Sequence, residues 1–140
     1  VDEPWTVVSA MPVMKESGCP GTDVIVPSTG HRRAPILNIG SLRAASIRAQ
    51  TGAPYSMSET LALSPWGITT QKCRQLFGWQ KGLGIDRFFP HGFYTSSEGV
   101  QNYEAPPDYG PNSSIFPGMG VLNDWVKRGE HALQMRAPLV

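Results

Sequence analysis

The sequence predicts an α/β fold in which short strands alternate with helices. The compact apolar run at 22–29, bounded by turn-forming residues, is typical of a strand; 53–59 is the next strand candidate, and 85–97 is expected to be strand and then loop. A helical pattern follows each run. Such alternation favours βα units and a parallel sheet. Three units cannot close a barrel, so the chain is expected to be part of a larger α/β fold.

The first unit begins after a turn-rich stretch, 11–21, in which no regular element is expected. Residues 22–29, "TDVIVPST", form a compact apolar run and are expected to be a buried strand. A helix is predicted from Asn38, its cap, to about Gln50, and Gly52 is a suitable C-terminal stop. Its apolar face is predicted from helical spacing to contain Leu42, Ala45 and Ala49.

The second unit is a strand at 53–59 that ends at Glu59, followed by a helix from Thr69 or Thr70 to Lys81. Thr69 is a suitable N-cap, and Gly82 or Gly84 a suitable end. One face of this helix is marked by Leu76, Phe77 and Gln80.

The third unit is strand and then loop over 85–97, a long loop rich in aromatic residues and proline, and a helix at 119–133. The buried stripe of this last helix is predicted to consist of Leu122, Trp125, Val126 and Leu133.

Composition and charge exclude several classes of function. The formal net charge is +1 and no basic stripe is present, so a nucleic-acid partner is not expected. No apolar run approaches the ~20 residues that span a bilayer. Charged residues make up 16% of the chain, below the ~25% of an average domain, which suits a surface partly covered by something else. Cys19 and Cys73 show no metal-binding spacing and are expected to be reduced thiols.

Polar and aromatic residues collect where the predicted strands end, which is where parallel α/β folds place their chemistry. The first end offers Ser28, Thr29, His31, Arg32 and Arg33; the second offers Ser58, Glu59 and Trp66; the third offers His91, Tyr94, Thr95 and Glu98, then Tyr103 and Glu104. Aromatic rings stack on sugars, and carboxylates do acid–base or nucleophilic work on them. This set of residues therefore points to carbohydrate.

Each of these residues also has a plain structural interpretation. Glu59 is equally compatible with a solvated loop acid, and Trp66 with a cover over apolar residues. A lone histidine such as His91 is more often structural than catalytic. No metal site is expected, because His31, His91 and His131 lack local ligand spacing. A phosphate-binding glycine loop and a Gly-x-Ser-x-Gly nucleophile motif are also absent from the sequence.

The stretch "APYSMSETLALSPWGITTQKCRQLFGWQKGLGIDRFFPHGFYTSS" resembles part of large bacterial glycoside hydrolases of the α-L-rhamnosidase-like kind. The pattern is Ser-Glu-Thr at a strand end, a loop with Trp-Gly, a helix with Trp-Gln, and His-Gly-Phe-Tyr. Flanking stretches, "NIGSLRAASIRAQTG" and "YEAPPDYGPNSSIFPGMGVLNDWVKRGEHAL", extend the resemblance over residues 22–133.

The resemblance implies that residues 1–140 are the C-terminal part of a (β/α)8 TIM barrel, about strands six to eight with their helices. Glu59 would then close strand seven as a catalytic carboxylate, and His91 and Tyr94 would close strand eight facing the sugar. Trp66, Tyr103 and His31 would line the pocket. The second carboxylate would come from an earlier strand. A calcium ion holds the sugar in some members, but the sequence shows no complete oxygen cage.

The leading hypothesis is therefore a glycoside hydrolase acting on poly- or oligosaccharide outside the cytoplasm, extracellular or periplasmic. It needs the remaining barrel strands, so the isolated chain is expected to be inactive. The alternative is a non-catalytic carbohydrate-binding or structural α/β fragment, in which Glu59 only accepts hydrogen bonds from a sugar. A third hypothesis is a distinct small α/β enzyme complete in 140 residues, which would unfold cooperatively by itself.

Overall fold

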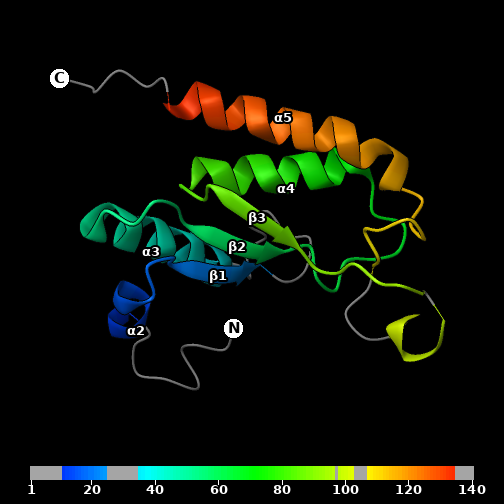
Figure 1. Ribbon diagram of the computed structural model, residues 1–140, viewed down its shortest axis with the longest axis horizontal. Helices are drawn as coiled ribbons and strands as arrows, with labels where there is room; N and C mark the ends of the chain where they lie inside the picture. Colours follow the sequence, from blue (N-terminus) through cyan, green and yellow to red (C-terminus); the bar gives the residue numbers. More distant parts are fainter. Residues whose placement is uncertain (1–10, 25–34, 97, 103–106, 135–140) are drawn as a thin grey trace.

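The computed structural model describes residues 11–24, 35–96, 98–102 and 107–134. Within these residues the chain forms a mixed α/β structure with one small sheet and helices before, between and after its strands (Figure 1). The predicted α/β class is confirmed at this level.

The sheet has three strands of four residues each, β1 (Gly21–Val24), β2 (Met57–Thr60) and β3 (Arg87–Pro90). Their order in the sheet is β1-β2-β3, and both pairs are parallel. Each predicted strand is thus present, and β2 and β3 are shorter than the predicted spans 53–59 and 85–97. The described part of the first strand ends at Val24, and residues 25–34 lie outside the described residues.

The helices are α2 (Met11–Glu16), α3 (Pro35–Thr51), α4 (Thr70–Gly82) and α5 (Phe116–Gln134), with a short 3-10 helix η1 (Gly99–Asn102). α3 connects β1 to β2 and α4 connects β2 to β3, so both crossovers of the sheet are helical. Figure 1 shows α5 running alongside α4, and the two helices contact each other along their length.

Both crossover helices pack on the same face of the sheet. Thr22 of β1 packs against α3. The hydroxyl oxygen of Thr60 in β2 accepts a 2.8 Å hydrogen bond from Gln80 of α4. The ring of Phe88 in β3 lies 4.8 Å from that of Phe77 in α4, centroid to centroid. These contacts define the helix-covered face.

Alternate residues of a strand point to opposite faces, so the residues between these point away from the helices. They are in register across the sheet: Asp23 pairs with Glu59, and Glu59 with Phe89. Phe89 is 52% exposed. Among the described residues no helix covers this second face, which we call the open face.

The main core lies between α4, α5 and the loops that follow β2 and β3. Its buried members are Leu61, Ile68, Cys73, Leu76, Phe77, Tyr109, Ile115 and Leu122. The predicted buried face of α4 is confirmed, because Leu76, Phe77 and Gln80 are all buried. The predicted N-cap is confirmed too: the hydroxyl oxygen of Thr69 accepts a 3.2 Å hydrogen bond from the N–H of Lys72. In α5 Leu122 is buried and Trp125 is partly buried, as predicted, but the side chain of Leu133 is outside the described residues.

Two predictions in the N-terminal half are wrong. The stretch 11–21, expected to be turns, contains α2 before it turns at Ser17 and Gly18. The apolar face predicted for α3 is also misplaced at two of its three residues: Ala45 is half-buried beside Gly84, but Leu42 is 48% exposed and Ala49 is exposed. The side chains that α3 buries are Ser41, Ala44 and Ile47. Small side chains let this helix approach β1 closely, and that contact decides which face is buried.

α3 and α5 each begin three residues earlier than predicted, at Pro35 and Phe116. Pro35 fits the first helical position, where no N–H is needed. Gly52 ends α3 with φ of 70°, which is the left-handed conformation that favours glycine at this position.

A polar network joins the N-terminal ends of β2 and β3 to the end of α3. Asp86 accepts a 3.1 Å hydrogen bond from the N–H of Ser56 and forms a 3.0 Å ion pair with Arg48. The Ser56 hydroxyl donates to the carbonyl of Gly84 at 2.7 Å. These bonds fix where the two strands start, and therefore their register.

No described helix is both long enough and apolar enough to span a membrane.

Candidate functional site

Glu59 lies on the open face near the C-terminal end of β2. It is the third of the four strand residues, and it is half-buried while its neighbours Ser58 and Thr60 are fully buried on the helix-covered face. A parallel strand places such a residue at the edge of the sheet where ligands bind in α/β folds. The structure therefore agrees with the position predicted for Glu59 at a strand end.

Asp23 is a second carboxylate on the same face, and sequence analysis did not select it. It pairs in register with Glu59 on the neighbouring strand. Adjacent strands lie ~4.8 Å apart, so the two side chains start close together. The signal was present in the sequence, because Asp23 stands in the predicted strand 22–29, but only the register of the sheet makes it a neighbour of Glu59.

His91 follows β3 directly and lies beside the end of β2. Its backbone N–H donates to the carbonyl of Thr60 at 2.9 Å, which extends the pairing of β2 and β3 by one residue. The ring is half-buried, and its buried Nδ1 atom has no hydrogen-bond partner in the described structure. Buried polar atoms without a partner are uncommon, and a catalytic or ligand-binding role is one of their recognised explanations.

Tyr94 stands next to His91, with ring centroids 6.4 Å apart and planes at 76°. Its backbone N–H donates to Asp108 Oδ1 at 3.2 Å, and the N–H of Gly110 donates to the same oxygen at 2.7 Å. Asp108 is fully buried, and its other oxygen, Oδ2, has no partner among the described residues. A single buried carboxylate thus holds the segment after β3 against the loop before α5.

Asp108 was missed by sequence analysis, which considered strand ends only. Backbone hydrogen bonds also join the segment after β3 to the loop before α5. The N–H of Gly92 donates to the Pro107 carbonyl, and the N–H of Tyr109 donates to the Gly92 carbonyl. These contacts join residues far apart in sequence, and no local pattern marks them.

The loop after Glu59 has an unusual backbone. Leu61 and Leu63 both adopt positive φ values, 70° and 56°. This conformation costs roughly 1–2 kcal/mol for a residue with a side chain, and such strain is concentrated at functional sites. Tyr109 braces the loop by donating its hydroxyl to the Leu61 carbonyl at 3.1 Å, and burial raises the pKa of that phenol.

Trp66 lies in this same loop, half-buried, between the strained residues and the start of α4. The structure therefore places Glu59 within β2, Trp66 in the loop after β2, and His91 and Tyr94 in the segment after the neighbouring strand β3; of these side chains, His91 and Tyr94 are in ring contact. The other two predicted site residues, His31 and Tyr103, lie outside the described residues.

The described residues contain no group of three or more His, Cys, Asp or Glu side chains that could hold a metal ion. Cys19 and Cys73 are both free thiols.

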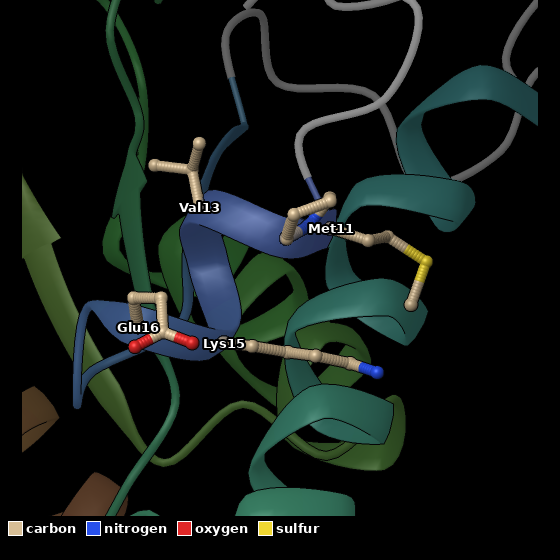
Figure 2. Close-up of a pocket in the computed structure, with 5 residues that line it drawn as sticks. Met11, Val13, Lys15 and Glu16 are labelled. Atoms are coloured by element: carbon tan, nitrogen blue, oxygen red, sulfur yellow. The ribbon is translucent and has the colours of Figure 1, made fainter.

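A hollow of about 640 Å³ lies away from these segments, beside the short helix α2. Figure 2 shows Met11 and Lys15 extending along the neighbouring helix while Val13 points away from it. None of its lining residues was predicted as a site residue, and we assign no function to it.

Comparisons of the sequence and structure with protein-family models, curated proteins and solved structures found no significant match. The arrangement of the residues themselves therefore carries the functional argument.

Proposed function

We propose that this chain is the C-terminal part of a glycoside hydrolase barrel, about strands six to eight, and that Glu59 is one of its catalytic carboxylates. The observation that carries the proposal is the position of Glu59. It stands on the open face of a parallel sheet, near a strand end, with His91 and Tyr94 on the neighbouring strand's continuation.

The proposal of a barrel is supported by the crossover helices, which cover only one face of the sheet. Parallel sheets are almost always covered on both faces, but here the crossover helices lie on one face only. Strands in sequential order with all helices outside are the arrangement of a (β/α)8 barrel, in which the inner face is covered by the other strands. On this proposal the open face looks into the barrel, and the remaining strands are the chain's partners.

Glycosidic cleavage needs two carboxyl groups on either side of the scissile bond. Glu59 would act as nucleophile or as base, and His91, Tyr94 and Trp66 would contact the sugar. Asp23 supplies a possible second carboxyl within this chain. The strand spacing of ~4.8 Å is compatible with the ~5–5.5 Å separation of retaining enzymes. The resemblance points instead to a carboxylate from an earlier strand, and to His31 and Tyr103 as further pocket residues.

The substrate is proposed to be a poly- or oligosaccharide, met outside the cytoplasm. The reaction as proposed needs no cofactor, and the calcium of some similar enzymes enters by resemblance only.

The test is Glu59→Gln in the full-length protein, assayed on a panel of 4-nitrophenyl glycosides that includes the α-L-rhamnoside. Loss of an acid–base or nucleophilic group lowers kcat by about 10²–10⁴-fold, while KM should change little. Glu16→Gln is the matched control, because Glu16 is exposed on α2 and outside the segments that follow the strands; its kcat should stay within about twofold of the unmodified value.

If Glu59→Gln retains more than half of the activity, the catalytic assignment is wrong. If the unmodified protein binds glycans but cleaves none, and Glu59→Gln only weakens binding, the non-catalytic alternative is correct.

A further inference from the structure

A groove of about 530 Å³ lies between α4 and α5. Its apolar floor comes from α5, where Leu122 is buried and Trp125 is half-buried, and Val121, which is 72% exposed, lies at its rim. α4 contributes Thr70, Gln71 and Arg74 to the groove. α4 and the sheet separate it from the open face that carries Glu59, so the groove is a different site.

Two glycines set how closely these helices approach. A Cβ atom on Gly118 would lie 2.8 Å from a methyl group of Thr70, and one on Gly78 would lie 3.2 Å from the tip of the Trp125 ring. The first contact is too close for a Cβ atom unless Thr70 shifts, and the second is tight. The two glycines therefore let side chains of the opposite helix pack directly against the backbone, which brings α4 and α5 close together.

The groove is positively charged. Arg74 lies over the Trp125 ring at 5.0 Å, which holds its guanidinium beside the floor, and Arg128 lines the same groove from α5. Among the described residues neither guanidinium has a carboxylate within ion-pair distance. Asp124 stands four residues before Arg128, a spacing that commonly pairs on a helix, and still makes no ion pair with it. The N-terminal end of α4 adds partial positive charge at Thr70 and Gln71.

We propose that this groove binds a sugar acid of an anionic glycan, with the carboxylate held between Arg74 and Arg128. Guanidinium groups match carboxylates in geometry and charge. The Thr70 hydroxyl and the Gln71 amide suit sugar hydroxyls, and the exposed Val121 suits the apolar face of a sugar ring. The volume falls in the range of small-ligand pockets, ~300–1,000 Å³, and suits one or two sugar units. A peptide could not bind here by strand addition, because the groove lies between two helices and offers no free strand edge.

The direct test measures binding of trigalacturonate to the full chain by isothermal titration calorimetry at low salt. The fully methyl-esterified trisaccharide is the matched neutral probe. Binding of the acid and not of the ester is expected, and raising the salt concentration should weaken it.

Three variants locate the site. Arg74→Gln and Arg128→Gln should each weaken trigalacturonate binding by about tenfold, because each removes a charge-assisted hydrogen bond. Lys127→Gln removes the same charge from an exposed position of α5 outside the groove, and should change the affinity by less than about twofold. Val121→Glu places a carboxylate at an exposed position of the groove and should abolish binding without affecting folding.

Equal binding of acid and ester, no binding of the acid at millimolar concentration, or equal effects of Lys127→Gln and Arg74→Gln would each overturn the proposal. Tighter binding of hexaglutamate than of trigalacturonate would show that the groove takes acidic peptide instead. Glu59→Gln should leave this binding unchanged, so failure here and failure of the hydrolase proposal can be told apart.

Discussion

Asp108 offers the sharpest test of how the site is held together, through the substitution Asp108→Ala. The side chain is fully buried, and its Oδ1 atom accepts hydrogen bonds from the backbone N–H groups of Tyr94 and Gly110. Alanine leaves both N–H groups without an acceptor. Gly110 is buried, and Tyr94 is half-buried, so water can replace the lost acceptor at Tyr94 more easily.

The expected loss follows from these two bonds. A buried group left unsatisfied costs about 1–3 kcal/mol, and we take the upper part of that range for Gly110 and the lower part for Tyr94. The sum is about 4 kcal/mol. Removing the buried Oδ2 atom, which has no partner among the described residues, recovers about 1 kcal/mol of desolvation. Asp108→Ala should therefore lower the free energy of unfolding by about 3 kcal/mol.

The assay is urea unfolding followed by tryptophan fluorescence, with Asp108→Asn as the control. Asparagine keeps an oxygen at the Oδ1 position and should cost about 1 kcal/mol or less. The reasoning is refuted if alanine costs less than about 1 kcal/mol, or if asparagine costs as much as alanine.

Three further predictions concern the thiols, the effect of pH and the strained loop. In the native chain Ellman's reagent should label Cys19, which is partly exposed, and reach Cys73 only on unfolding, because Cys73 is fully buried; fast labelling of both would contradict the packing. Burial raises the pKa of Cys73 from its usual 9.0 to about 11, so its contribution to the free energy of unfolding is fully present below pH 9 and is lost as pH rises toward 11, by at most about 2–3 kcal/mol. Cys73→Ala should therefore reduce the fall of the unfolding free energy between pH 9 and 10, below the range in which buried Tyr109 adds a loss of the same sign. If the unfolding free energy falls as steeply with pH in the variant, the Cys73 thiol is not the cause. Leu63→Gly should raise the melting temperature, because relief of roughly 1–2 kcal/mol of left-handed strain exceeds the ~0.5–1 kcal/mol entropy cost of glycine. The control Leu42→Gly, at a similarly exposed position of α3, should lower the melting temperature, because glycine within a helix costs about 1 kcal/mol of stability. Equal effects of the two substitutions would show that Leu63 is not strained.

Local signals predicted the elements that local physics determines. Thr69 caps α4 and Gly52 ends α3 as their residue types indicate. The buried side of α3 could not be predicted in the same way, because Leu42 is the more apolar residue yet is 48% exposed, whereas Ala44 is fully buried. Packing distance, and not hydrophobicity, decides between them. The helix α2 was missed because Pro12 and Gly18 within and after a six-residue helix resemble a turn sequence.

The residues of the candidate site likewise fall into those that local sequence predicts and those that only contacts between distant segments reveal. Strand ends are visible in a sequence, so Glu59 and His91 could be predicted to lie near each other. Asp23 required knowledge of the sheet register, and Asp108 required the approach of two loops distant in sequence. Pairings of that kind carry no periodic signal, and only the folded chain reveals them.

The network of Arg48, Ser56 and Asp86 sits at the end of the sheet opposite to Glu59. Strand alignment is therefore secured by bonds that no loop at the Glu59 end takes part in. Exposed positions of those loops, such as Leu63 and Phe93, can be exchanged while the strands keep their alignment. A designer who wished to graft new specificity onto this scaffold would vary such positions and keep both this network and the buried loop residues of the core, such as Leu61.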